Sequence, residues 1–424
     1  MLLLKNGHIL DPFTGLDEIR DILIDDTGCI ARVEAGIQVS GVRMIDLTGL
    51  TAAPGLIDTH VHFRDPGQTE KEDIFSGAKA AAAGGFTTVV CMANTVPSCD
   101  SIDTLETVYR RAAQVQNVHI LQACAITKGL RGGELTDFAA LRQAGAAGFT
   151  DDGINLTDAV LARRAMEEAV RQDVLLSFHE EDPVLLGSPG VNAGSAAAER
   201  LGVPGADPCS EECMVERDIA LACETGARVV FQHISSAGSV ELIRRAKASG
   251  AAVYCEATPH HLSLTEEAVL KHGTYARMNP PLRTERDRQA IVEGLADGTI
   301  DMIATDHAPH TAAEKAREWA KAPSGIIGLE TAFSVCNTWL VQPGRLTRMQ
   351  LLEKMSRNPA QIYGLTGKGI LAGNHAELVL LDWDQPITYS SYQSKASNTP
   401  YTGMPFTGVV CGTIFGSTVT GRFA

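Results

Sequence analysis

The chain has 424 residues, of which 44% are hydrophobic and 21% are charged, and this composition excludes disorder as a description of the whole protein. Its 36 basic and 51 acidic side chains give a net charge of −15, which argues against a nucleic-acid-binding surface and against a polybasic membrane anchor. A chain of this length can bury a core that needs no metal for stability, so a metal bound here would serve chemistry.

Both ends of the chain have the pattern of strands and turns. Residues 1–10 are rich in apolar side chains, and residues 21–25 and 29–33 flank an Asp-Thr-Gly turn, which predicts a hairpin. Residues 376–382 and 409–414 are also strand-like. We therefore predict one small β-sandwich built from residues 1–52 and 368–424.

The sequence also indicates the cellular compartment in which the protein is expected. The first residues, MLLLKNGHILDP, become polar too soon for a signal peptide, and no run approaches the roughly 18 apolar residues that a membrane span requires. The ten cysteines are too sparse for a secreted disulfide scaffold. Cys209 and Cys213 lie close together, but no second pair follows, so loop cysteines are preferred over a zinc knuckle. The expectation is a cytoplasmic protein.

Eight short apolar runs with helical patterns between them fill the middle of the chain. The runs cover residues 55–61, 87–92, 118–126, 146–150, 174–178, 228–232, 252–255 and 300–305, and the clearest helical patterns cover residues 71–83, 158–171, 212–225, 240–249 and 285–296. Eight βα units predict an α/β fold, a (β/α)8 TIM barrel over residues 53–367. An open doubly wound sheet is the alternative, but its first strand would precede a glycine-rich turn, where this chain has His-Val-His. Residues 311–324 are expected to form a helix or a mobile loop over the barrel mouth.

Polar side chains of metal-ligand type stand where these runs end. They are His60 and His62 after the first run, Asn94 after the second, Asp151 and Asp152 after the fourth, His179 after the fifth, His233 after the sixth, and Asp306, His307 and His310 after the eighth. In a barrel the carboxyl ends of the strands meet on the face that carries active sites. Histidines and carboxylates gathered there suit one or two divalent ions such as zinc.

Each of these residues also has a structural explanation. His60 and His62 share one face of a strand and could do so by chance, His179 or His233 could be a core histidine, and Asp306 could cap a helix. Such explanations would have to hold at four strand ends together, so a metal site is the better interpretation. The remaining histidines give weaker evidence of function. A secondary role is open for His260 and His261, and structural or surface positions are expected for His8, His119, His272 and His375.

These ligands indicate hydrolysis of an amide or ester, or its reversal. Zinc lowers the pKa of bound water to about 7, a second ion can hold the same hydroxide, and a carboxylate such as Asp306 could bind metal and accept the proton. Arg64, two residues after His62, has the planar guanidinium that suits a substrate carboxylate. An ion pair with Asp65 or Glu70 is the structural alternative for Arg64.

The order of the motifs resembles the dihydroorotases of the amidohydrolase superfamily, in particular the bacterial class I type. The motifs are HVHFRDPG at 60–67, GGFTTV at 84–89, MANTVP at 92–97, GFTDDG at 148–153, HE at 179–180, QHISSAGSV at 232–240, ATPHHL at 257–262, MNPPLR at 278–283 and ATDHAPH at 304–310. Nine motifs in the right order make the resemblance dense, and the terminal segments fit the composite sandwich of that superfamily.

The resemblance implies reversible cyclisation of N-carbamoyl-L-aspartate to L-dihydroorotate, a step of pyrimidine biosynthesis, at two Zn²⁺ ions per subunit. It implies that His60, His62 and Asp306 hold one zinc, that His179 and His233 hold the other, and that Asp152 rather than Asp151 bridges them. The residues implied to contact substrate are His62, Arg64, Asn94, Asn279, His310, Ser324 and Gly325. Ser324 stands where the family commonly has phenylalanine, which leaves the ring contact there open.

Two other functions compete with this interpretation. Related cyclic amidases act on hydantoin, dihydropyrimidines or allantoin, but they usually carry a carboxylated lysine at the bridging position, where this chain has Asp152. Dihydroorotase-like chains that only scaffold aspartate transcarbamoylase lose metal ligands, whereas every expected ligand is present here. A homodimer and an association with aspartate transcarbamoylase are both compatible with an active enzyme, and one sequence does not decide them.

Overall fold

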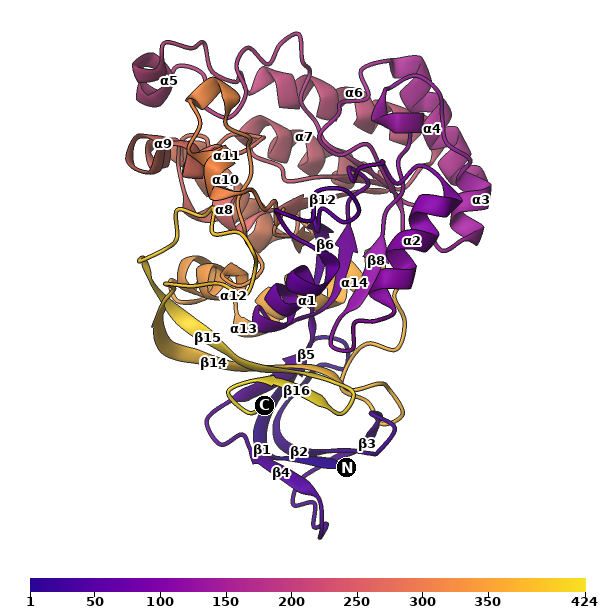
Figure 1. Cartoon of the computed structure of the whole chain (residues 1–424), viewed down its shortest axis with the longest axis vertical. Helices are drawn as coiled ribbons and strands as arrows, with labels where there is room; N and C mark the ends of the chain where they lie inside the picture. The colour runs from indigo at the N-terminus through magenta and orange to yellow at the C-terminus, as the bar shows by residue number, and fades with distance from the viewer.

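The computed structural model describes residues 1–424. Both ends of the chain meet in one sheet, drawn in indigo and yellow at one end of the molecule in Figure 1. The hydrogen-bonded order is β16-β15-β14-β5-β1-β2-β3, with β4 paired to β1. The strands are β1 (Leu2–Asp11), β2 (Leu16–Ile24), β3 (Ile30–Glu34), β4 (Arg43–Asp46), β5 (Thr51–Pro54), β14 (Glu377–Thr388), β15 (Pro405–Phe415) and β16 (Thr418–Gly421).

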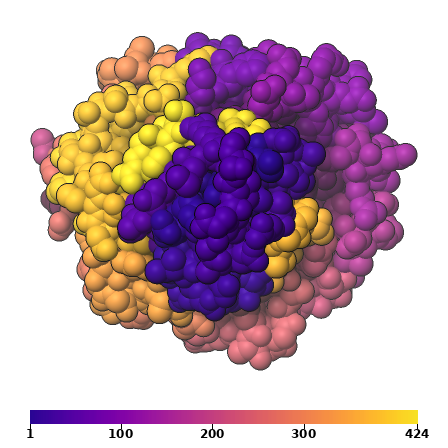
Figure 2. All heavy atoms as spheres, turned by 90° about the horizontal axis from the view of Figure 1, so that it is seen from below, coloured from indigo at the N-terminus to yellow at the C-terminus, as the bar shows by residue number.

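Strand β5 joins the two ends of the chain, because it pairs in parallel with β1 and antiparallel with β14. Seen from below, the N-terminal and C-terminal segments accordingly lie side by side (Figure 2). The hairpin expected around residues 26–28 is present as the antiparallel pair β2 and β3. The hydrogen bonds define a single sheet of eight strands, and the two-layer sandwich stays a prediction.

The middle of the chain alternates strands and helices, and all of its strand pairs are parallel. One sheet has the order β6-β7-β8 and the other the order β13-β12-β11-β10-β9. The bounds are β6 (Leu56–Val61), β7 (Phe86–Cys91), β8 (His119–Gln122), β9 (Phe149–Thr150), β10 (Leu176–Phe178), β11 (Val229–Phe231), β12 (Val253–Ala257) and β13 (Met302–Ile303). Each of the eight predicted runs coincides with one strand. Six of the strands are shorter than their runs, because flanking residues such as 123–126 stay buried after the ladder ends.

Two isolated parallel bridges connect these sheets. One joins Cys124 to Phe149, between the regions of β8 and β9. The other joins Val61 at the end of β6 to His307 after β13, where the His62 amide donates to the His307 carbonyl at 2.9 Å.

Helices follow the strands and pack against them, as α1 does against β7, α2 against β8 and α7 against β12. Their bounds are α1 (Ile74–Ala83), α2 (Ile102–Ala112), α3 (Phe138–Gln143), α4 (Ala159–Gln172), α5 (Ala196–Leu201), α6 (Cys209–Thr225), α7 (Ala237–Ala248), α8 (Pro259–Ser263), α9 (Glu267–His272), α10 (Glu285–Asp297), α11 (Ala312–Lys315), α12 (Ala332–Cys336), α13 (Arg348–Leu352) and α14 (Asn358–Ile362). The five predicted helical patterns correspond to α1, α4, α6, α7 and α10. None of the helices combines the length and the apolar content needed to cross a bilayer.

Local sequence explains these helices. Helix α4 begins after Asp158, whose carboxylate accepts from the amides of Val160 and Leu161, and it buries Leu161, Ala165 and Ala169 along one face. The segment at 311–324, expected to be a helix or a loop, contains α11 and a short 3₁₀ turn, Trp319–Lys321. A main core of 75 buried hydrophobic residues surrounds the parallel strands, and a separate cluster of 16 lies in the terminal sheet. The terminal sheet thus has a hydrophobic cluster of its own, although Leu10, Val379, Leu381 and Trp383 from its strands belong to the main core.

Candidate active site and metal centre

Six side chains from five strand ends converge in the interior of the middle segment. They are His60 on β6 with His62 just after it, Asp152 after β9, His179 after β10, His233 after β11 and Asp306 after β13, and none is more than 7% exposed. The backbone is strained at this edge, because Arg64, His233 and Asp306 have positive φ angles of 58°, 33° and 47°. Non-glycine residues hold that conformation at a cost, and such strain clusters at functional sites.

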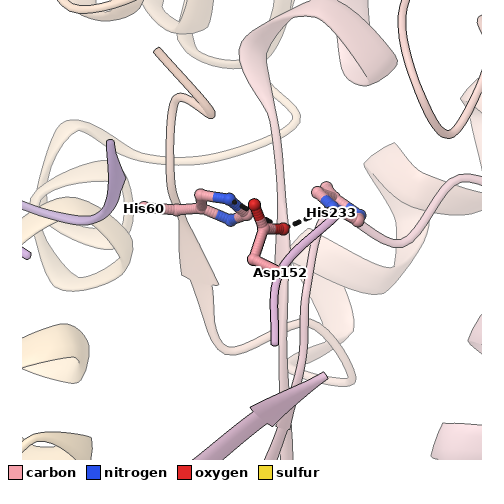
Figure 3. Close-up of side chains that lie close together, drawn as sticks. All are labelled: His60, Asp152 and His233. Atoms are coloured by element: carbon pink, nitrogen blue, oxygen red, sulfur yellow. Dashed lines mark ion pairs between the residues drawn. The ribbon is translucent and has the colours of Figure 1, made fainter. Parts of the chain in front are cut away.

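Asp152 lies at the centre of the cluster. Its Oδ1 is 3.3 Å from His60 Nε2, 3.7 Å from His233 Nε2 and 3.8 Å from His179 Nδ1, and its Oδ2 is 3.5 Å from His62 Nε2. Figure 3 shows the carboxylate between the imidazoles of His60 and His233. The two oxygens of one carboxylate thus face all four imidazoles.

Asp306 faces the same space from the end of β13. Its Oδ1 lies 3.0 Å from His62 Nε2 and 3.6 Å from His60 Nε2. Two overlapping groups therefore have all their ligand atoms within 4.8 Å of one another: His60, His62 and Asp306, and His60, Asp152 and His233.

Outward hydrogen bonds determine which ring nitrogens carry protons. His60 Nδ1–H donates to Glu256 Oε1 at 2.6 Å, and His62 Nδ1–H donates to Asn94 Oδ1 at 2.9 Å. His179 Nε2–H donates to Glu181 Oε2 at 2.9 Å. In the neutral form of each ring the inward nitrogen would therefore keep its lone pair for a metal ion, which is how second partners orient metal-binding histidines.

The inward lone pairs face carboxylates and one another, and this arrangement calls for a cation. His60 Nε2 is buried and has no hydrogen-bond partner, although Asp152 Oδ1 is only 3.3 Å away. Burial alone would lower the pKa of His60, yet Asp152 and Glu256 raise it well above its usual value. Burial would raise the pKa of Asp152, and the surrounding histidines instead hold it well below its usual range. The residues present fit a divalent metal with nitrogen and oxygen ligands.

The neighbouring Asp151 points away from this cluster. Its carboxylate accepts from the Thr127 amide at 3.0 Å and from the Thr127 hydroxyl. Burial raises the pKa of Asp151 to about 6. Of the two adjacent aspartates, only Asp152 reaches the imidazoles.

A polar cavity of about 190 Å³ opens beside the cluster, with room for about six water molecules at roughly 30 Å³ each. Its lining comprises His62, Arg64, Asn94, Asp152, Gly153, His179, His233, Asn279, Asp306, Ala308, Ser324 and Gly325. A larger surface groove of about 760 Å³ runs past α5 and α9, but none of the metal-ligand groups lies there. The smaller cavity is therefore the candidate substrate site.

Arg64 enters this cavity without an ion-pair partner. The alternative partner Asp65 pairs instead with Arg111, whose Nη2 lies 2.7 Å from Asp65 Oδ2. Arg64 Nε is buried and unpartnered. Burial lowers the pKa of Arg64, an effect that Asp306 and Asp152 oppose. The cavity thus holds a guanidinium whose donors are free for an anion.

The other predicted substrate residues line the cavity or stand behind it. Asn94 donates to Asp152 Oδ2 at 3.3 Å, so its amide is already engaged on both sides, and Asn279 Oδ1 accepts from Ser324 Oγ at 3.3 Å. His310 does not line the cavity: its Nε2–H donates to the Ser324 carbonyl at 2.8 Å. Burial, with the nearby cation of Arg64, lowers the pKa of His310 to about 3.

An asparagine distant in the sequence connects the segments around His310 and Gly325. Asn398 is 1% exposed, its Nδ2 donates to the carbonyls of Ala308 and Gly325 at 3.0 Å each, and its Oδ1 accepts from the His310 amide at 3.0 Å. Sequence reasoning missed Asn398, together with Glu181 and Glu256. Glu256 stands on β12 directly before the ATPHHL motif, and its place in a buried strand was the signal that could have found it.

His261 and the two cysteines weighed from the sequence belong to none of the metal-ligand groups. His261 is buried, and its Nε2–H donates to the Pro280 carbonyl at 3.0 Å. Cys209 and Cys213 lie on α6 rather than in a loop, one turn apart and exposed, and no metal-ligand group includes them.

Comparisons with known proteins identify the family of the chain. A family model described as dihydro-orotase-like matches residues 49–239. The chain is 52% identical to a dihydroorotase from Clostridioides difficile (strain 630) over 414 residues, and 46% identical to one from Streptococcus pneumoniae serotype 4 over 416 residues. Each alignment covers 98% of both chains.

Solved structures show the same fold. An L-hydantoinase (dihydropyrimidinase) from Arthrobacter aurescens superposes with a TM-score of 0.88 at 26% identity, covering 99% of this chain and 96% of the other. A dihydropyrimidinase from Brevibacillus agri NCHU1002 superposes with a TM-score of 0.84 at 21% identity, covering 99% and 95%. The chain thus shares its fold with these two proteins, and its full-length sequence similarity is to dihydroorotases: the chain belongs to the dihydroorotase family.

Proposed function

We propose that this protein is a zinc-dependent dihydroorotase that interconverts N-carbamoyl-L-aspartate and L-dihydroorotate in pyrimidine biosynthesis. The observation that carries the proposal is the central Asp152 carboxylate, which faces four imidazoles beside a cavity holding an unpaired guanidinium. The full-length similarity to dihydroorotases supports it.

The proposed ligands divide between two zinc ions. His60, His62 and Asp306 would hold one ion, His179 and His233 would hold the other, and Asp152 would bridge them. Metal bound there would acidify a water molecule and polarise the substrate carbonyl. His60 Nε2 belongs to both ligand groups of the metal-free geometry, so its assignment to one ion is part of the proposal.

Asp306 would move the proton. Burial raises its pKa, but the hydrogen bond with His62 and the nearby His60 and His233 lower it further, so the group is a carboxylate at neutral pH. In hydrolysis Asp306 would accept the proton of the attacking water and pass it to the leaving amide nitrogen. In cyclisation it would start protonated and return that proton.

The cavity would select an acidic ring. Arg64 would bind the substrate carboxylate, and Asn279, Ser324 and Gly325 would border the ring. Asn94 and His310 would aid Arg64 by exchanging their present partners, Asp152 and the Ser324 carbonyl, for the substrate. A substrate without the carboxylate would leave the buried guanidinium unpaired, which costs binding energy.

A related cyclic amidase is the second candidate, because the hydantoinase structures share the fold. Two features favour the dihydroorotase: no lysine lines the cavity that could serve as a carboxylated bridging ligand, and Arg64 lies there unpaired, ready for an acidic substrate. Purified zinc-loaded protein should be assayed on dihydroorotate, dihydrouracil, hydantoin and allantoin. Dihydroorotate should be preferred by roughly 10⁴ in kcat/KM, the discrimination expected from a site with unpaired polar groups. Equal turnover of dihydrouracil would favour the amidase.

The finer architecture belongs to the same proposal. We propose that the two parallel sheets close into one eight-stranded barrel, which the bridges Cys124–Phe149 and Val61–His307 support. The separate hydrophobic clusters support a catalytic domain at 53–367 and a terminal β-sandwich domain at 1–52 and 368–424. Tyr401 and Phe406 nevertheless pack into the main core. A cytoplasmic location, a homodimer and an association with aspartate transcarbamoylase remain predictions.

A further inference from the structure

A second group of metal-ligand side chains lies far from the active-site cluster, where the terminal sheet meets the parallel strands. It consists of His119, the first residue of β8, together with His375 and Glu377 at the start of β14. The candidate active site lies at the carboxyl ends of the parallel strands, whereas His119 stands at the amino end of β8. The two groups are therefore at opposite edges.

The distances suit coordination of one ion by three ligands. His119 Nε2 lies 3.0 Å and His375 Nδ1 lies 3.6 Å from the same oxygen, Glu377 Oε1, and all three atoms are within 4.8 Å of one another. Ligands about 2.0–2.2 Å from a tetrahedral zinc are separated by roughly 3.3–3.5 Å, and the two measured distances bracket this value.

His375 Nδ1 has no hydrogen-bond partner in the protein. The nitrogen is buried, and although it faces Glu377 Oε1 it makes no hydrogen bond with it. The remaining carboxylate oxygen, Glu377 Oε2, pairs with Lys368 Nζ, which leaves Oε1 to the two imidazoles. A cation between the three inward atoms would satisfy the lone nitrogen.

Packing holds both imidazoles in position. The ring of Phe415 meets His119 and His375 edge-on, with centroid distances of 4.7 and 4.9 Å. Gly416 leaves the room that the His375 ring occupies, because a Cβ atom there would lie 2.8 Å from His375 Nε2. The histidine side chains are 49% and 37% exposed, so an ion can reach the group from solvent.

We propose that His119, His375 and Glu377 form a peripheral binding site for a divalent transition metal, with zinc as the representative ion and water completing the coordination. Two imidazoles and one carboxylate are a ligand set for borderline ions, whereas Mg²⁺ and Ca²⁺ prefer oxygen ligands and should not compete. Binding moves the Nε2 proton of His119 to Nδ1 or to solvent. The ion would join β8 to the start of β14, across 258 positions of the chain.

The metal content of matched variants tests the proposal. Wild type, His119→Ala, His375→Ala and the control His8→Ala should be equilibrated with buffered zinc and analysed for bound metal. His8 is the matched control because it pairs with Asp17 at 2.6 Å in the same sheet but belongs to no metal-ligand group. We expect His119→Ala and His375→Ala to hold one zinc per chain fewer than wild type, and His8→Ala to match it. Equal zinc content in all four proteins would overturn the proposal.

A second measurement uses only the wild-type chain, in case a variant fails to fold. Histidines are modified with diethyl pyrocarbonate with and without zinc, and each peptide is quantified by mass spectrometry. Zinc should slow modification of His119 and His375 at least about tenfold and leave His8 unchanged, while magnesium should protect none of them. Unchanged labelling of His119 and His375 would reject the site, whatever the active-site metals do.

Discussion

Replacing Arg64 with methionine separates a substrate-binding role from a structural one. Arg64 has a buried, unpartnered Nε, and its neighbour Asp65 is already paired with Arg111. If Arg64 binds the substrate carboxylate with two charge-assisted hydrogen bonds, each is worth about 1.5–3 kcal/mol. Their loss sums to about 3–6 kcal/mol, and at about 1.4 kcal/mol per decade kcat/KM should fall roughly 10²–10⁴-fold.

The Arg64→Met variant should not lose stability, although it loses activity. An unsatisfied buried donor costs about 1–3 kcal/mol, so its removal should leave the free energy of unfolding unchanged or raise it. The backbone strain at φ = 58° is the same for methionine. Arg111→Met is the matched control, because it should destabilise the fold by leaving Asp65 without its partner and should leave substrate preference alone.

The decisive assay compares two substrates. Steady-state kinetics on dihydroorotate and dihydrouracil give the preference for the carboxylate, and thermal unfolding gives stability. Arg64→Met should abolish most of the preference, and Arg64→Lys should restore only part of it, because an ammonium cannot copy the bidentate guanidinium. Normal KM for dihydroorotate together with a lowered melting temperature would refute the reasoning and make Arg64 a structural residue.

Three further predictions follow from the geometry. Asp306→Asn should lose about three decades of kcat, the scale of general acid–base catalysis, and near-normal turnover would exclude the role. Because the pKa of Asp306 lies below its usual range, wild-type hydrolysis should fall, and cyclisation should be favoured, only where the pH drops below the ordinary range of an aspartate. Metal-free protein should regain full activity with zinc in buffer stripped of carbon dioxide, and a requirement for bicarbonate would contradict Asp152 as the bridging ligand. Asp152→Ala should lose the metal at His179 and His233 first, and an unchanged zinc content would contradict the same role. Asn398→Ala should raise KM more than it lowers kcat, by about tenfold for two or three lost hydrogen bonds, since it frees the loops around His310; a lower melting temperature with unaltered KM would restrict Asn398 to a structural role.

The sequence by itself was sufficient for the alternation of strands and helices and for the positions of the candidate ligands. Apolar runs and helical periods reflect local backbone geometry, so each of the eight runs coincides with a strand. The two-residue spacing of His60 and His62 indicated that both rings face the same way, and at the end of β6 both lie near Asp306. Strand ends also indicated which histidines and aspartates would converge.

Tertiary structure decided through which atoms these groups meet and which second partners orient them. Asp151 and Asp152 are adjacent in the sequence, but the turn after β9 directs only Asp152 to the imidazoles. Glu256 orients His60 from 196 positions away, and Asn398 ties down His310 from 88 positions away. His119 and His375, which the sequence assigned to the surface or to structural roles, face one carboxylate only because the start of β14 lies beside the first residue of β8. Local periodicity carries no information on such pairs, because their distances depend on how distant strands are packed together.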